Sequence, residues 1–190
     1  RRIAWVSWNH PQMPWDGTKL VLGTLDVDGP LAPTMADSTV VAGDRGTAIF
    51  QPEFSPNGRF LSYISDANGW GNLYLFDLKT ERHRPLVVCD AELGSPAWRQ
   101  GMRTYGWSPD STTIYYCRSR QASTRLWSVD VTSGDTAPVP GLDDYTSFSQ
   151  IDVSASGRVA FIASGPVAPK RVVTYSPSSG VARVVARAES

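Results

Sequence analysis

The residue types that could carry catalysis in this chain are histidine, cysteine, serine and the two acids, and their spacing decides what each could do. An α/β-hydrolase holds its nucleophile in a Gly-x-Ser-x-Gly turn, and the 190-residue sequence contains no such turn. His10 and His83 stand far apart, and no Cys and His spacing suits a metal ion. We therefore predict no catalytic residue, no metal site and no cofactor in this chain.

Aspartates that recur along the chain are expected to stabilise turns and not to catalyse a reaction. Asp26, Asp77 and Asp130 each follow an apolar run, a position that favours capping of a turn by a short carboxylate. Glu53 and Asp152 stand in predicted inner strands, where paired carboxylates could serve a carbohydrate-active enzyme. We keep that enzyme class only as a minor alternative.

The elements that would position these residues are short strands. Alternation of apolar and polar residues with a period of two predicts strands at 50–54, 60–64, 73–78 and 85–89. The turn Ser55-Pro56-Asn57-Gly58 separates the first two, with Pro preset at one corner and Gly free to take a positive φ. This stretch is predicted to be a four-stranded antiparallel meander.

The same pattern recurs along the chain about every 50 residues. Ser108-Pro109-Asp110-Ser111 and Ser154-Ala155-Ser156-Gly157 repeat the turn, each ahead of further short apolar runs. Four copies of four short strands at this period are typical of a propeller. The fold class is therefore predicted as all-β, a partial β-propeller of about four four-stranded antiparallel blades.

One propeller unit is expected to cover residues 1–190. Its blades are predicted at 1–44, 45–93, 94–144 and 145–190. The first repeat lacks an inner strand and the turn that should precede Arg1, so we expect the chain to be part of a larger propeller.

Composition narrows the class of protein. Apolar residues make up 41% of the chain, and 16 Gly and 14 Pro suit a turn-rich β protein. The 18 basic and 18 acidic residues form no basic stripe, so nucleic acid is not an expected partner. No run approaches the ~20 apolar residues of a membrane span. Cys89 and Cys117 are expected to be free thiols, which fits a cytoplasmic location.

Unusual residues gather on one predicted rim. In a four-stranded blade, the loops between the second and third strands and the links between blades share one face. The predicted site residues there are Trp15, Asp16, Trp70, Glu92, Trp98 and Met102. Two interpretations stay open: a contact surface for a ligand or domain, or tryptophans that only wedge between neighbouring blades.

Three stretches resemble a known family. They are AWVSWNHPQMPWDGTKL at 4–20, FQPEFSPNGRFLSYISDANGWGNLYLFDL at 50–78 and SPAWRQGMRTYGWSPD at 95–110. They are similar to the propeller domain of prolyl oligopeptidase-like serine peptidases, in the acylaminoacyl-peptidase and dipeptidyl-aminopeptidase-like branch. The resemblance covers residues 1–130 well and is weaker over 131–190, where Ala155 replaces the turn Pro.

The resemblance implies a two-domain enzyme. In that family the propeller caps a C-terminal α/β-hydrolase domain with a Ser-Asp-His triad and admits only small peptides. This chain would be the non-catalytic part, which gates access and helps to position short peptides for a hydrolase domain that the chain does not contain. Its partners would be that domain and a peptide substrate, whose amino terminus Glu92 or Asp16 could hold.

A rival function stays open. A TolB-like propeller that scaffolds protein partners, without an enzymatic domain, explains the Ser-Pro-x-Gly turns equally well. It does not explain the HPxMPWDGT string at 10–18.

Overall fold

The computed structural model describes residues 1–28 and 32–188, which form strands and loops and no helix. The strands of the first two sheets are β1 (Arg2–Ser7), β2 (Lys19–Asp26) and β3 (Thr34–Ala42), then β4 (Ile49–Phe54), β5 (Phe60–Ser65), β6 (Asn72–Asp77) and β7 (Arg82–Val87). Those of the last two are β8 (Tyr105–Trp107), β9 (Thr113–Arg120), β10 (Ser123–Asp130) and β11 (Thr136–Pro138), then β12 (Ser147–Val153), β13 (Val159–Gly165), β14 (Ala168–Ser176) and β15 (Val181–Arg187).

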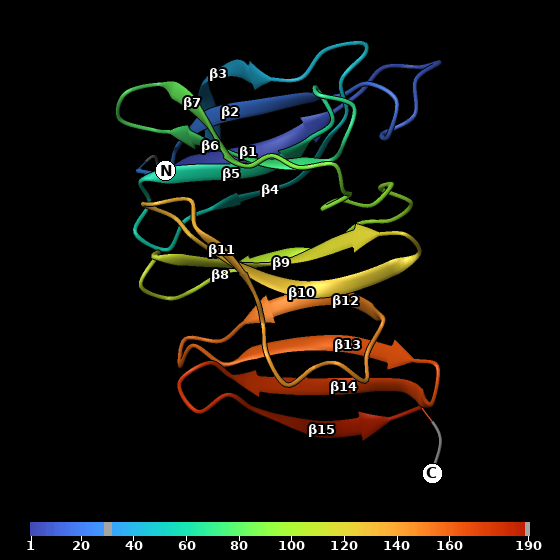
Figure 1. The fold of residues 1–190 in the computed structure, drawn as a ribbon. Helices are drawn as coiled ribbons and strands as arrows, with labels where there is room; N and C mark the ends of the chain where they lie inside the picture. Colours follow the sequence, from blue (N-terminus) through green and yellow to red (C-terminus); the bar gives the residue numbers. More distant parts are fainter. Residues whose placement is uncertain (29–31, 189–190) are drawn as a thin grey trace.

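These strands make four antiparallel sheets that are stacked in chain order (Figure 1). Each sheet is a meander in which consecutive strands pair. The predicted fold class, a partial propeller, is confirmed. Each predicted blade range holds the strands of one sheet, and the first sheet has three strands where the others have four.

One outer strand differs from its sequence-based range. β7 runs from Arg82 to Val87 and not from 85 to 89. Its first three residues are polar, and only Leu86 and Val87 are buried. Hydrophobic alternation therefore locates the start of this strand poorly.

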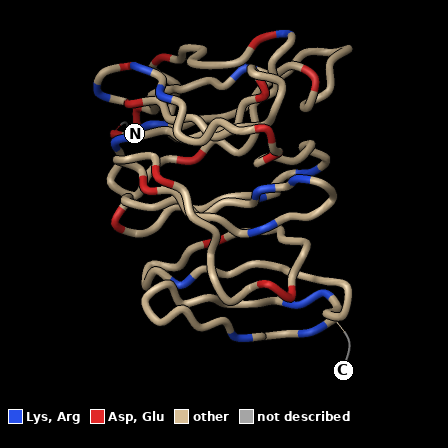
Figure 2. The backbone as a smooth tube through the Cα atoms, in the orientation of Figure 1, with Lys and Arg blue, Asp and Glu red and all other residues tan. Residues whose placement is uncertain are grey.

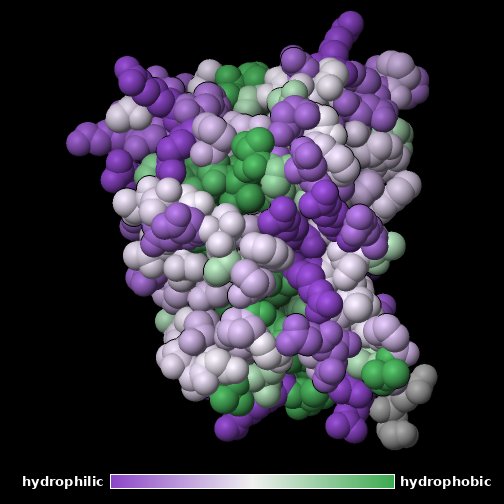
Figure 3. All heavy atoms as spheres, viewed as in Figure 1, coloured by the Kyte–Doolittle hydropathy of each residue, from purple (hydrophilic) through white to green (hydrophobic). Residues whose placement is uncertain are grey.

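Three apolar clusters lie between the four sheets and hold the stack together. The first contains Leu20, Ile49 and Leu61 from the first two sheets, and the last contains Leu126, Phe148 and Phe161 from the last two. The middle cluster joins the second sheet to the third and includes Tyr105, Trp107 and Tyr116. At the end of the stack, valines of β15 face solvent, and hydrophobic atoms are visible there in Figure 3.

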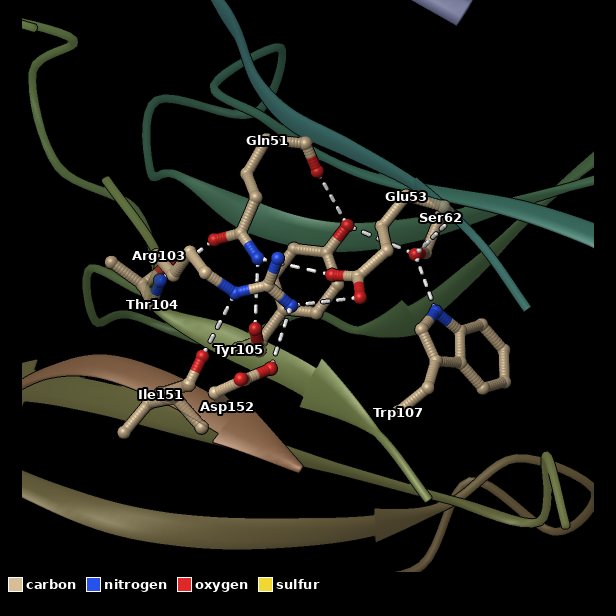
Figure 4. A network of polar contacts seen from close by, with 9 residues as sticks. All are labelled: Gln51, Glu53, Ser62, Arg103, Thr104, Tyr105, Trp107, Ile151 and Asp152. Atoms are coloured by element: carbon tan, nitrogen blue, oxygen red, sulfur yellow. Dashed lines mark hydrogen bonds and ion pairs between the residues drawn. The ribbon is translucent and has the colours of Figure 1, made fainter. Parts of the chain in front are cut away.

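Polar contacts between the second and third sheets lie beside this middle cluster (Figure 4). The hydroxyl of the fully buried Tyr105 donates to the carbonyl oxygen of Gln51 at 2.5 Å and lies 2.9 Å from Ser62 Oγ. Trp107 Nε1 donates to the same Ser62 hydroxyl at 2.8 Å. These bonds satisfy polar atoms that the apolar core would otherwise leave unpaired.

Bulges in two inner strands aim glutamine side chains at the third sheet. Gln51 in β4 and Gln150 in β12 have φ of 47° and 56°, in the left-handed region that a non-glycine residue rarely adopts. The Gln51 amide accepts from Thr104 N at 2.7 Å and donates to the Tyr105 carbonyl at 2.8 Å. The Gln150 amide accepts from Arg103 N at 3.0 Å. Both bulged strands are therefore tied to the segment 103–105.

Carboxylates cap the turns after the third strand of the blades, as the sequence predicts. Asp77 Oδ1 accepts from the backbone N–H groups of Lys79 and Thr80 at 2.9 and 3.0 Å. Asp130 makes the equivalent bonds in the next blade, and Asp26 accepts from the N–H of Asp28. The hydrogen bonds from the backbone hold the pKa of both Asp77 and Asp130 below its ordinary value.

The contacts between the second and third sheets predict that the hydroxyl groups of two neighbouring tyrosines contribute differently to the free energy of unfolding. Tyr105 and Tyr116 are paired across β8 and β9, but the Tyr116 hydroxyl has no hydrogen-bond partner among the described residues. Tyr105→Phe should lower the free energy of unfolding by about 1–3 kcal/mol, because it leaves the Gln51 carbonyl oxygen without its donor. Tyr116→Phe should change it little. Urea denaturation measures both, and equal losses would contradict this role for the hydroxyl.

The turns capped by Asp77 and Asp130 predict that the thermal stability of the chain depends on pH. Because the pKa of Asp77 and Asp130 is lower in the folded chain, their stabilisation is complete above the unfolded value near ~4 and is lost as pH falls below it. The Tm of Asp77→Asn/Asp130→Asn should therefore fall less steeply than that of the wild type between about pH 5 and 2. The control is Asp143→Asn, because Asp143 is exposed and caps no described turn. Equal slopes in all three proteins would contradict the prediction.

Candidate functional site

The predicted rim is a continuous surface at one edge of the stack. The β1–β2 loop, the β5–β6 loop and the link from β7 to β8 meet there around two hollows. The larger one, here called the rim groove, has a volume of about 910 Å³ and is lined by residues near β1, by the start of β4 and by 97–102. The smaller one, here called the Glu92 pocket, has a volume of about 360 Å³. Both volumes fall in the range of small-ligand sites.

Two tryptophans from distant loops pair at the boundary of the two hollows. The ring centroids of Trp15 and Trp98 lie 4.4 Å apart, and the ring planes are inclined at 44°. Trp15 is half-buried and lines both hollows, whereas Trp98 is 70% exposed and lines the rim groove together with Met102. Exposed aromatic surface of this kind commonly contacts a ligand or another protein.

Local hydrogen bonds shape the loop that carries Trp15. Asp16 N donates to the Met13 carbonyl at 3.0 Å, and Met13 N donates to the Asp16 carboxylate at 2.9 Å. Gly17 is required after them, because a Cβ there would collide with the backbone carbonyl of Arg45. The loop is thus held against the link between β3 and β4, and its Trp15 lines both hollows.

Glu92 lies at the mouth of the smaller pocket. Its carboxylate accepts from Gly71 N at 2.9 Å, while its backbone pairs with Ser119 of β9 in an isolated bridge. A Cβ on residue 71 would lie 2.7 Å from the Glu92 carboxylate oxygen, so glycine permits this approach. Glu92 is exposed, and its carboxylate accepts one hydrogen bond from the described residues, which leaves it able to accept from a ligand amine.

The structure brings together four of the six predicted site residues. Trp15, Trp98 and Met102 share the rim groove, and Trp15 and Glu92 share the Glu92 pocket. Asp16 is exposed and bonds its own loop. Trp70 is 40% exposed between two glycines that line the pocket, although its own ring is not part of the lining. A functional role for these residues stays a prediction.

Sequence reasoning missed the group around Arg103. Its Nη2 lies 2.8 Å from Glu53 Oε1 and 3.7 Å from Asp152 Oδ1, and its Nε donates to the Ile151 carbonyl (Figure 4). One guanidinium therefore neutralises both inner-strand carboxylates, which argues against their use as a catalytic pair. The recurrence of Gln51-x-Glu53 as Gln150-x-Asp152 is the sequence signal that could have revealed this group.

The remaining reactive groups are structural. Both cysteines are free, and burial raises the pKa of Cys117 to about 12, so its thiol is not activated. His83 Nδ1 lies 2.8 Å from the Tyr63 hydroxyl on the opposite side of the blade. No cluster of three potential metal ligands occurs among the described residues. A cytoplasmic location stays a prediction.

Surface charge and hydropathy add two observations. Basic and acidic residues occur at all levels of the stack (Figure 2). Within residues 1–28 and 32–188, no helix is long and apolar enough to cross a membrane.

Comparison with solved structures defines the class of protein. A puromycin hydrolase has a TM-score of 0.86 and 29% sequence identity, and the match covers 98% of this chain and 27% of that chain. A puromycin-hydrolyzing peptidase of Mycobacterium tuberculosis has a TM-score of 0.82 and 27% identity over the same shares. TolB of Acinetobacter baumannii has 16% identity and a TM-score of 0.52, so it supports the propeller fold alone.

Sequence comparison is consistent with this class. No family model matches the sequence. Dipeptidyl-peptidase 5 of Porphyromonas gingivalis is 30% identical over 142 residues, which cover 70% of this chain and 19% of that protein. Actin-interacting protein 1 of Drosophila melanogaster is 32% identical over 139 residues, which cover 68% of this chain and 21% of that protein.

The chain is homologous to the propeller domains of prolyl oligopeptidase-family peptidases. Its similarity extends over the N-terminal propeller region of these peptidases. It spans between 19% and 27% of the length of the relatives named above with more than 25% identity.

Proposed function

We propose that this chain is the non-catalytic propeller domain of a serine peptidase and that its rim faces the α/β-hydrolase domain of the parent protein. In this role the domain gates access to the active site and helps to position short peptides. The observation that carries the proposal is the meeting of the Trp15–Trp98 pair with Glu92 around two adjoining hollows. Aromatic walls suit apolar side chains, and a partly free carboxylate suits an α-amine.

Similarity to enzymes that act on small peptide-like substrates supports this proposal. Two of the solved relatives are described as puromycin hydrolases and one curated relative as a dipeptidyl-peptidase. Of the two acids on the rim, Glu92 is the stronger candidate for binding the amine. Glu92 lines one of the two hollows, whereas Asp16 lines neither of them.

An interaction module without a catalytic domain is the second candidate. The similarity to actin-interacting protein 1 favours it, because the name of that protein denotes binding to another protein. The parent gene distinguishes the two candidates. A Gly-x-Ser-x-Gly motif downstream, followed by Asp and His, supports the peptidase, whereas a stop codon close to Ser190 supports the module.

The aromatic pair predicts an effect on catalysis. In the intact parent enzyme, Trp15→Ala should lower kcat/KM for short peptides about tenfold, which corresponds to about 1.4 kcal/mol of lost transition-state binding. Trp70→Ala should lower it in the same direction. Val185→Ala, in the outermost strand of the last sheet, is the control. An unchanged kcat/KM in a Trp15→Ala protein with unaltered circular dichroism would refute the proposal.

The Glu92 carboxylate predicts an effect on KM that is selective for peptides with a free amino terminus. Glu92→Gln keeps an acceptor for Gly71 N but removes the charge, so KM should rise about five- to tenfold for a peptide with a free amino terminus. An N-acetylated peptide that the parent enzyme also cleaves should show no such rise. Asp90→Asn, two positions away and outside both hollows, is the matched control. Equal changes for the free and the acetylated peptide would exclude amine binding by Glu92.

A further inference from the structure

A third hollow lies on the side of the stack opposite the rim, where turns of the second and third sheets meet. It is here called the turn-face pocket, and its volume of about 650 Å³ is in the range of small-ligand sites. It shares no lining residue with the rim groove or with the Glu92 pocket. Binding in the turn-face pocket is therefore independent of the proposed substrate site.

Hydrogen bonds between the two sheets fix the walls of the turn-face pocket. Asn57 N, in the β4–β5 turn, donates to Ser111 Oγ in the β8–β9 turn at 3.0 Å. Arg84 of β7 donates from Nη2 to the carbonyl oxygen of Val131, which follows β10. The pocket is thus preformed, and preformed sites lose less free energy to ordering when a ligand binds. The apolar part of its lining consists of Phe60, Leu75 and Val131.

Arginines give the polar part of the lining an excess of positive charge. Its charged residues are Arg59, Arg82, Arg84, Asp77 and Asp110. Arg59 already has a counter-charge, because its Nη2 lies 3.3 Å from Asp77 Oδ2. Burial lowers the pKa of His83, which also lines the pocket, so this residue adds no charge at about pH 7. One positive charge is therefore left over in the pocket.

Two arginines of the lining have N–H groups available for a ligand. Arg82 and Arg84 are two positions apart in β7, so their side chains project to the same face of the sheet. Neither forms an ion pair within residues 1–28 and 32–188. Guanidinium groups bind oxyanions through parallel N–H bonds. The two side chains together are therefore suited to hold an oxyanion.

The two aspartates of the lining are engaged in their own turns. Asp77 accepts from the N–H groups of the β6–β7 turn and from Arg59. Asp110 Oδ1 accepts from the Ser108 hydroxyl at 2.6 Å and from Thr112 N at 3.1 Å. These bonds hold the pKa of Asp110 below its ordinary value. Both carboxylates are thus stabilised without Arg82 or Arg84.

The repeat does not require the arginines of this pocket. Asp130 lies 53 positions after Asp77 and caps the equivalent turn of the third sheet. The strand register agrees, because β10 pairs with β11 as β6 pairs with β7. At this spacing the counterparts of Arg59, Arg82 and Arg84 are Thr112, Asp135 and Ala137. The basic lining is therefore specific to this pocket and is no part of the blade architecture.

We propose that the turn-face pocket binds a small organic acid, with its carboxylate between Arg82 and Arg84 and its apolar body against Phe60 and Leu75. One carboxylate supplies the one negative charge that balances the lining. A phosphate monoester carries about two negative charges and would make the occupied pocket negative. The apolar lining selects acids with an aromatic or branched body over acetate, because that body is removed from water on binding.

Titration calorimetry of the 190-residue chain with 3-phenylpropanoate tests the proposal. Acetate lacks the apolar body of this probe, and 3-phenylpropan-1-ol lacks its charge. Each of these matched ligands should bind about tenfold more weakly than 3-phenylpropanoate, because each loses one of the two kinds of contact. The measurement needs no catalytic domain, so its result does not depend on whether the parent protein is a peptidase.

Substitutions in β7 locate the carboxylate. Arg82→Gln removes an exposed guanidinium that has no ion pair in the described part of the chain. It should weaken binding of 3-phenylpropanoate about tenfold with an unaltered circular dichroism spectrum. Arg84→Gln should weaken it similarly, and Arg82→Gln decides the question if the Arg84 variant does not fold. The control is Arg158→Gln, because Arg158 follows the turn of the fourth sheet as Arg59 follows that of the second and lies outside the pocket lining.

Four results would overturn the proposal. The first is the absence of binding of 3-phenylpropanoate, and the second is equal affinity for the acid and the alcohol. The third is unchanged affinity in Arg82→Gln. The fourth concerns N-acetylglycylphenylalanine, which carries the same carboxylate and phenyl ring at the end of a peptide. If this peptide binds about tenfold more tightly than 3-phenylpropanoate, the ligand is the carboxyl terminus of a polypeptide and not a small acid.

Discussion

The stack depends on the burial of apolar side chains between neighbouring sheets. A single four-stranded sheet has two faces and can cover neither of them by itself, so each sheet obtains its core from the next one. The three clusters lie at the three contacts between sheets, and Tyr105 contributes to the middle one with its ring. Its hydroxyl, together with Gln51 and Ser62, then adds directional bonds that fix how the second and third sheets meet.

This repeated packing also creates the rim. Because every blade has the same strand order, the loops between second and third strands and the links between blades gather on one side of the stack. Their lengths and residues are free to vary there, since the clusters and the inner strands already hold the sheets. Trp15 and Trp98, 83 positions apart in the chain, meet for this reason. The opposite side carries short capped turns such as the one at Asp77, around a hollow of about 650 Å³ that Asp77, His83 and Asp110 help to line.

Much of the architecture could be predicted from the residue pattern. The period of about 50 residues, the Ser-Pro-x-Gly turns and the carboxylates after third strands depend on local backbone geometry, which acts wherever these residues occur. The start of β7 could not be predicted, because its first three residues are polar and pair with β6 through the backbone. The group around Arg103 was also missed. Its partners Glu53 and Asp152 lie in two other blades, and no local pattern joins them.

The sequence by itself determined the strand pattern, the repeat and the rim on which unusual residues lie. Short-range propensities and turn chemistry act within one blade and suffice for these features. Only the tertiary structure decided which rim residues meet. It paired Trp15 with Trp98, set Glu92 beside Gly71 and engaged Asp16 within its own loop. These contacts depend on the distance and rotation between neighbouring sheets, which packing of whole sheet faces sets.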